Sequence, residues 1–179
     1  SSPSLVVVNP SLPVKSVKEL IALAKQRPGQ INMGSGSPGS SGSIAGTLFR
    51  EMADIDLVVI PYKSGSDRAT ALLSGQITVD FLGSSGVQTY LKSGKVKAIA
   101  ITSKRSSPQF PGIPAVAETV PDFEYGSTAL MFAPAKTPAA IVTRLNQDIN
   151  KTLKEPETIK MLEEFGADLV CLKLAGTHP

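Results

Sequence analysis

Short apolar runs alternate with helix-period patterns along the first half of the chain. The apolar run 5–8 is stopped by an Asn-Pro pair and predicts a buried strand. Ser16 and Glu19 match a capping box, and the apolar positions after them predict a helix that ends at 28–29, a Pro-Gly pair. Further strands are expected at 31–33, 57–60, 77–82 and 97–102, and further helices from Ser40 or Ser41, from Ser66 or Asp67, and from 83–86.

Strands and helices that alternate through short loops indicate parallel βαβ units. The expected fold class is therefore α/β, with a parallel-rich sheet flanked by helices. The run 57–60 holds four apolar residues between Asp56 and Pro61, as in a strand that is covered on both faces. In a parallel sheet, all strands direct their carboxyl ends to the same edge.

The pattern changes at 103–125, which has four prolines and no periodicity, as in a linker that crosses a surface. After it, a strand is expected at 129–133. A helix is then expected behind Thr137 and Pro138, and a second one from Pro156. The change at 103–125 therefore suggests that the chain leaves one lobe, 5–126, and enters another, 127–179.

Composition indicates a globular protein and argues against a nucleic-acid partner. The 179 residues are 41% apolar and 18% charged, with 18 Lys+Arg, 15 Asp+Glu and a formal net charge of +3. The basic residues are scattered singly, and the six Phe and three Tyr do not interleave with them. A mildly basic, solvated surface is therefore expected. No apolar run approaches the roughly 18 residues that a membrane span needs.

The chain has one cysteine and one histidine, and these low numbers exclude several kinds of site. Cys171 alone can form neither an internal disulfide nor a zinc site of several cysteines. His178, close to the end of the chain, is the only imidazole. A Ser-His-Asp triad and a histidine-based metal site within the folded body are therefore excluded. No catalytic residue, metal or cofactor is predicted.

Three loops rich in serine and glycine each follow a predicted strand and open a predicted helix: 34–43, 61–66 and 83–86. In a parallel sheet these loops emerge along one edge, where α/β proteins form their ligand sites. Unpaired N–H groups at helix N-termini favour a small anion such as a carboxylate or phosphate. The alternative, that the serines are ordinary N-caps and the glycines ordinary turn residues, stays open.

The stretch 34–39 also matches the G-x-G-x-x-G spacing of a dinucleotide fold. The acidic partner of that motif is missing, because Asp56 precedes the next strand instead of ending it. Pro38 moreover removes a backbone donor from the supposed phosphate loop. A nucleotide-dependent α/β enzyme that uses this loop is therefore the weaker alternative.

Two single residues at strand ends are further candidates for ligand contact. Asp80, on the strand 77–82, could orient a ligand group or cap a nearby loop. Tyr62, just past the strand 57–60, could face a ligand or pack at the edge of the lobe. Residue type alone leaves both alternatives open.

The run 5–13, followed by 16–20, resembles the Bug (TctC-like) substrate-binding proteins of tripartite tricarboxylate transporters. This resemblance covers about residues 5–170. Other stretches that resemble the family are 31–35, 59–65, 73–77, 114–118 and 133–138.

The resemblance implies a type II periplasmic-binding-protein-like lobe in a two-lobed clamshell. Such a receptor closes on a dicarboxylate, a tricarboxylate or an acidic amino acid in the periplasm and delivers it to membrane transporter subunits. It implies no enzyme activity and no cofactor. The expected ligand-binding residues, with Tyr62 and Asp80 added from the strand ends, are Ser35, Gly36, Ser37, Gly39, Ser40, Ser41, Gly83 and Ser84.

Three departures from the family pattern affect these expectations. The segment with the first part of the other lobe and the signal peptide is absent before residue 5, so this chain is expected to bind weakly or to be binding-incompetent. Ser43 stands where many relatives have a histidine, and 168–173 does not continue the family pattern. Apolar surface left on the incomplete lobe makes a homodimer a further expectation.

Overall fold

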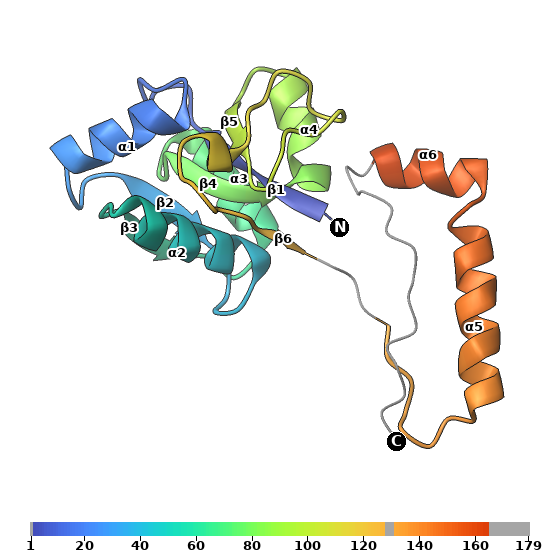
Figure 1. The fold of residues 1–179 in the computed structure, drawn as a ribbon. Coiled ribbons are helices and arrows are strands. Elements are labelled where there is room, and N and C mark those ends of the chain that lie inside the picture. The colour runs from blue at the N-terminus through green and yellow to red at the C-terminus, as the bar shows by residue number, and fades with distance from the viewer. Residues whose placement is uncertain (1, 128–130, 165–179) are drawn as a thin grey trace.

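The computed structural model describes residues 2–127 and 131–164 of the 179-residue chain (Figure 1). Cys171 and His178 lie outside the described residues. The described elements are β1 (Ser2–Val8), α1 (Val17–Gln26), β2 (Asn32–Ser35), α2 (Ser41–Ala53), β3 (Val58–Pro61), α3 (Gly65–Ser74), β4 (Val79–Gly83), α4 (Ser84–Lys92), β5 (Lys97–Ile101), the 3-10 helix Val116–Glu118, β6 (Gly126–Ser127), α5 (Ala139–Thr152) and α6 (Pro156–Glu164).

One mixed sheet has the strand order β3-β2-β4-β1-β5, and β6 pairs with the start of β1. Strand β2 runs parallel to β3 and to β4, which confirms the expected α/β class with a parallel-rich sheet. Strand β1, however, runs antiparallel to both β4 and β5, so the prediction of parallel units throughout is wrong for it. All four residues of the run 5–8 are 0% exposed. A strand buried on both faces has the same continuous apolar run in either direction.

Helices cover both faces of the sheet, and β1 divides the core between them (Figure 1). Val6 and Val8 belong to the cluster that α1 and α2 cover, whereas Leu5 and Val7 belong to the cluster with α3 and α4. In the first cluster the ring of Phe49 lies 5.6 Å from that of Phe81, centroid to centroid. The sheet is therefore a layer between two pairs of helices.

The expectation that the strand at 57–60 is covered on both faces is wrong for β3. It is the outer strand of the sheet, with β2 as its neighbour. Its residues Val58 and Val59 keep 39% and 37% of their surface exposed. A short apolar run therefore does not separate an edge strand from a central one, because both carry β-branched residues.

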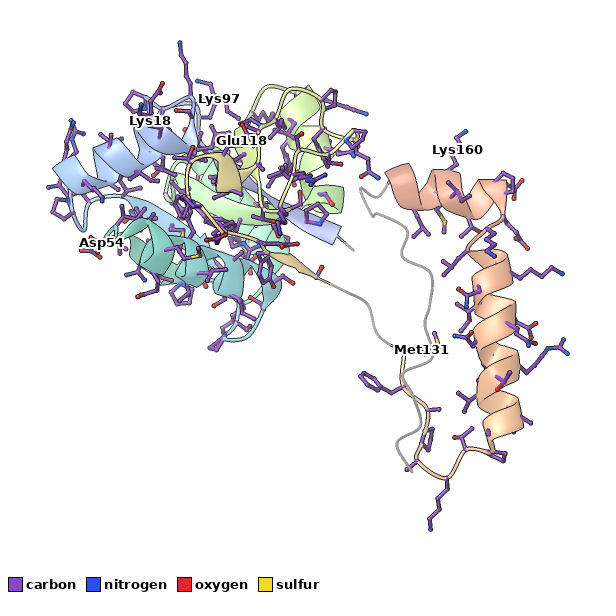
Figure 2. All side chains as sticks on the ribbon, viewed as in Figure 1. Lys18, Asp54, Lys97, Glu118, Met131 and Lys160 are labelled. Atoms are coloured by element: carbon purple, nitrogen blue, oxygen red, sulfur yellow. The ribbon has the colours of Figure 1, made fainter. Side chains whose placement is uncertain are left out.

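Helices α5 and α6 stand apart from the sheet and its covering helices (Figure 1). No residue of α5 is buried, and Ile141 and Leu145 are 50% and 48% exposed. Figure 2 shows Met131, which is 66% exposed, on the segment that leads into α5. Of the strand expected at 129–133, 129 and 130 lie outside the described residues, and 131–133 form no strand.

None of the described helices combines the length and the apolar character that a membrane-spanning segment needs.

Candidate functional site

The carboxyl ends of β2, β3 and β4 lie on one edge of the sheet, because these three strands run in the same direction. Ser35, the last residue of β2, pairs with Pro61, the last residue of β3. The N–H of Tyr62 then donates to the carbonyl oxygen of Ser35 at 2.8 Å. The topology therefore brings the three serine- and glycine-rich loops to one edge, which we call the loop edge.

The loop 36–40 leads from β2 into α2 and leaves donors at the start of that helix. Ser40 is the N-cap, and its Oγ accepts a hydrogen bond from the N–H of Ser43 at 3.4 Å. Among the described residues, no acceptor binds the N–H groups of Ser41 and Gly42 in the first turn. Two backbone donors and the positive end of the helix dipole are therefore available to an anion.

The helix after β3 begins earlier than the pattern predicted. Its N-cap is Ser64, whose Oγ accepts from the N–H of Asp67 at 3.1 Å, and not Ser66 or Asp67. The third helix, α4, follows β4 directly, with Gly83 as its N-cap. Ser84, the first residue of α4, is buried at 1% exposure. All three helices thus direct their N-termini toward the loop edge.

A buried ion pair lies beneath these loops, and sequence reasoning missed one of its members. Nε of Arg68, on α3, lies 2.8 Å from Oδ2 of Asp80, on β4. The Arg68 side chain is 10% exposed and that of Asp80 is 0% exposed. The N–H of Phe81 donates to Oδ1 of Asp80 at 2.7 Å, and Nη2 of Arg68 donates to the carbonyl oxygen of Phe81 at 3.4 Å. Arg68 therefore connects α3 to β4.

Glycines of the loop edge make room for the Arg68 side chain. A Cβ at Gly34 would lie 2.9 Å from Cγ of Arg68. A Cβ at Gly36 would lie 3.1 Å from Nη1 of Arg68, and a Cβ at Gly42 would lie 2.9 Å from the same atom. These distances are shorter than ordinary van der Waals contact. The glycine spacing that resembles a dinucleotide loop therefore admits a guanidinium group from the same protein.

Burial raises the pKa of the Asp80 carboxyl to about 7. The positive charge of Arg68 lowers the pKa of this carboxyl, and so do its hydrogen bonds with Phe81 and Arg68, but to a smaller extent. The Asp80 carboxyl group therefore titrates near neutral pH. At that pH, a share of the molecules keeps a neutral Asp80 beside a charged Arg68.

The structure places the predicted site residues at different depths. Asp80 is turned inward to Arg68, and Oγ of Ser35 donates to the carbonyl oxygen of Gly36 at 3.2 Å. Neither side chain is exposed to a ligand at the surface. Of the predicted residues, Ser37, Gly39, Ser41 and Gly83 are exposed, Gly36, Ser40 and Tyr62 are half-buried, and Ser35, Asp80 and Ser84 are buried.

A signal for Arg68 was present in the sequence. The buried face of α3 otherwise consists of Ala69, Ala71 and Leu72, so an arginine among them requires a buried acceptor or a bound anion. Asp80, placed inside an apolar strand, was the available partner. Joining the two required the distance between α3 and β4, which the sequence pattern does not supply.

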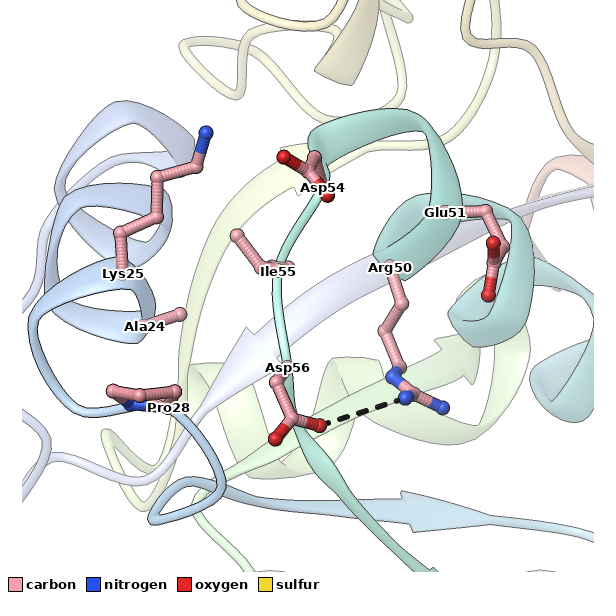
Figure 3. A pocket seen from close by; sticks show the side chains of 8 residues that line it. All are labelled: Ala24, Lys25, Pro28, Arg50, Glu51, Asp54, Ile55 and Asp56. Carbon is pink, nitrogen blue, oxygen red and sulfur yellow. Dashed lines mark ion pairs between the residues drawn. The ribbon is translucent and has the colours of Figure 1, made fainter.

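A surface depression lies away from the loop edge. Figure 3 shows it between the ends of α1 and α2, with Lys25, Arg50 and Asp54 among its lining residues, and its volume is about 450 Å³. It contains none of the predicted site residues. Because helices α1 and α2 direct their negative C-terminal ends toward it, this depression disfavours an anion. Among the described residues, no cluster of three metal-ligating side chains was found.

Comparison with known sequences identifies one family of receptors. The sequence profile described as "Tripartite tricarboxylate transporter family receptor" matches residues 1–174. Protein BugT of Bordetella pertussis is 31% identical over 166 residues, which make up 92% of this chain and 51% of BugT. The UPF0065 protein in the tcbD-tcbE intergenic region of Pseudomonas sp. (strain P51) is 29% identical over 179 residues, 99% of this chain and 52% of that protein. The chain spans about half the length of these relatives.

Comparison with solved structures leads to the same group. R. palustris Rpa4515 with adipate is 31% identical, with a TM-score of 0.84 over 92% of this chain and 56% of that one. The periplasmic binding protein BugD is 27% identical, with a TM-score of 0.81 over 92% of this chain and 56% of BugD. MatC from Rhodopseudomonas palustris with bound malate is 25% identical, with a TM-score of 0.81 and the same coverage of 92% and 56%.

These matches confirm the resemblance to the Bug (TctC-like) proteins and favour a receptor over a nucleotide-dependent enzyme. Structural neighbours match the chain over about half of their own length. Since the profile extends over nearly the whole sequence, the chain belongs to the tripartite tricarboxylate transporter family of receptors.

Proposed function

We propose that this chain carries the ligand-binding lobe of a periplasmic receptor that holds a small carboxylate and delivers it to a tripartite transporter. The observation that carries this proposal is the first turn of α2, where the N–H groups of Ser41 and Gly42 have no acceptor among the described residues. Such donors favour an anion. The adipate of Rpa4515 and the malate of MatC, both dicarboxylates, support the ligand class.

The proposed ligand contacts lie on the loop edge, and none of them performs chemistry. Backbone donors of the exposed and half-buried residues contact the carboxylate, whereas the buried residues shape the site. No covalent step or cofactor enters this function. The proposed site comprises Ser35, Gly36, Ser37, Gly39, Ser40, Ser41, Tyr62, Asp80, Gly83 and Ser84.

The division of the chain into 5–126 and 127–179 is part of the same proposal. The second segment would belong to the other lobe of the receptor, since Ile141 and Leu145 of α5 lie half exposed instead of packing on the sheet. A ligand that closes two lobes must contact both of them. One lobe alone is therefore expected to bind a dicarboxylate weakly, with a Kd of about 1 mM or above. A homodimer through α5 and α6 remains a prediction.

The first prediction follows from this site and is tested by NMR. Adding adipate or L-malate to the ¹⁵N-labelled chain is expected to shift the amide signals of 36–42, while amide signals of the depression around Arg50 and Asp54 stay unchanged. The matched control is acetamide, which has a similar carbonyl group without the charge. Absence of shifts in the loop at 50 mM dicarboxylate, or shifts with NAD instead, would contradict the proposed function.

A further inference from the structure

We propose that Arg68 is the cationic anchor of the site, and that its guanidinium group donates directly to the carboxylate of the bound ligand. This inference rests on the proposed function and adds to it a charged contact on the loop edge. It assigns to Asp80 the role of a positioning residue, which holds Arg68 and does not touch the ligand.

The hydrogen-bond partners of Arg68 leave one end of its guanidinium available. Nε pairs with Asp80 at 2.8 Å, and Nη2 donates to the carbonyl oxygen of Phe81 at 3.4 Å. Nη1 has no acceptor among the described residues. Nη1 is not among the fully buried unpartnered atoms of the described residues, although the Arg68 side chain as a whole is 10% exposed, so a ligand oxygen can reach this nitrogen and accept its hydrogen bond.

The position of Nη1 places this donor beside the backbone donors of α2. It lies 2.9 Å from the Cβ position of Gly42 and 3.1 Å from that of Gly36. The N–H groups of Ser41 and Gly42, which have no acceptor among the described residues, belong to the same turn. The Arg68 guanidinium therefore lies beside the N-terminus of α2, and a carboxylate bound there has two oxygens, one for each kind of donor.

Packing holds Arg68 ready for this contact before any ligand arrives. Asp80 and the Phe81 carbonyl fix two of its nitrogens, and Gly34, Gly36 and Gly42 approach its side chain closely. An arginine already held in place loses little side-chain entropy when it binds. Since burial raises the pKa of Asp80 to about 7, the charge of Arg68 is only partly cancelled near neutrality.

The competing interpretation is that the pair only fastens α3 to β4. Removing one partner does not separate the two interpretations, because it leaves a buried charge uncompensated. Replacing both partners does, because the double variant Arg68→Met with Asp80→Leu keeps an apolar contact of similar volume. If the pair is merely structural, this variant binds as the wild type does.

The test is an NMR titration of the chain with adipate. A parallel titration with the monoamide of adipic acid measures the role of the second carboxylate. The double variant is expected to bind adipate about 10- to 100-fold more weakly than the wild type. The matched control, Arg50→Gln with Asp56→Asn, removes an ion pair away from the loop edge, whose Nη2 and Oδ1 lie 3.7 Å apart and whose side chains are 26% and 62% exposed. This control is expected to bind adipate as the wild type does. In the wild type, adipate is expected to shift the side-chain N–H signals of Arg68, a readout that depends on no variant folding.

The role of Arg68 and the proposed function can fail separately. Two outcomes overturn the role of Arg68 and leave the proposed function intact. One is a folded double variant that binds adipate within about twofold of the wild type. The other is a set of wild-type Arg68 signals that stay fixed while the amide signals of 36–42 shift. Wild-type amides of 36–42 that do not respond to adipate or L-malate overturn the proposed function, and the inference falls with it.

Discussion

The ion pair between Arg68 and Asp80 links the stability of the lobe to its site. Both side chains are nearly or fully buried, so each depends on the other for compensation of its charge. The pair also lies where the loop after β2, the first turn of α2 and the end of β4 meet. A change in either residue is therefore expected to affect folding and binding together.

The stability of the lobe is expected to fall as the pH rises through neutrality. The folded-state pKa of Asp80 is raised to about 7, against an ordinary value of 3.8. A raised pKa means that the folded state holds the proton more tightly, so this contribution is fully present below about pH 4 and is lost by about pH 8. Between pH 5 and 8, the free energy of unfolding should decrease by about 3 kcal/mol from this group.

Urea denaturation at a series of pH values, for the wild type and for Asp80→Asn, measures this contribution. Asparagine keeps the shape of the side chain but does not titrate, so the slope between pH 5 and 8 should flatten even if the overall stability is lower. If stability depends on pH equally in the variant and the wild type, Asp80 does not titrate between pH 5 and 8.

At the scale of single elements, neighbouring strands decide the direction of a strand and its place in the sheet, whereas local sequence sets the helix caps. The apolar run of β1 predicted a strand but not its antiparallel direction, because a strand that is buried on both faces carries the same apolar run in either direction. The run of β3 predicted a strand but not its place at the edge. The helix starts at Ser16 and Ser40 follow from local sequence, since each side chain accepts a hydrogen bond from an N–H three residues later.

The N-cap of α3 allows a direct comparison of two neighbouring serines. Ser64→Ala removes the Oγ that accepts from the N–H of Asp67, so it is expected to lower the free energy of unfolding by about 1 kcal/mol. Ser66→Ala removes an exposed hydroxyl that contacts Oγ of Ser64 at 2.8 Å, and it should change stability by less than about 0.5 kcal/mol. Urea denaturation of the two variants gives the comparison, and the reverse order would place the cap at Ser66.

At the scale of the whole molecule, the sheet with its covering helices holds the buried clusters, to which no described residue of α5 or α6 belongs. Ile141, Leu145 and Met161 keep 50%, 48% and 51% of their surface exposed. Apolar side chains of this size, exposed at helical spacing, are typical of a surface that another part of a protein covers. The half-length match to the relatives agrees with this interpretation.

A chain shortened to 1–127 is therefore expected to unfold with nearly the same free energy as the 179-residue chain. The difference should stay below about 0.5 kcal/mol, because the removed helices share no buried cluster with the sheet. Phe49→Ala serves as the contrasting variant, since Phe49 is 0% exposed and packs on Phe81 and Phe123, and it should cost about 3–5 kcal/mol. A shortened chain that loses more than about 2 kcal/mol would indicate packing of α5 or α6 on the lobe.

The sequence by itself determined where most strands and helices lie, and that serine- and glycine-rich loops follow the strand ends. These features depend on residues a few positions apart, which set hydrophobic period and capping. Only the tertiary structure decided the direction of β1, the exposure of β3 and the pairing of Arg68 with Asp80. These depend on which elements become neighbours, and residues 68 and 80 meet because α3 packs against the sheet beside β4. The charge beneath the loops is therefore a property of packing, not of any motif.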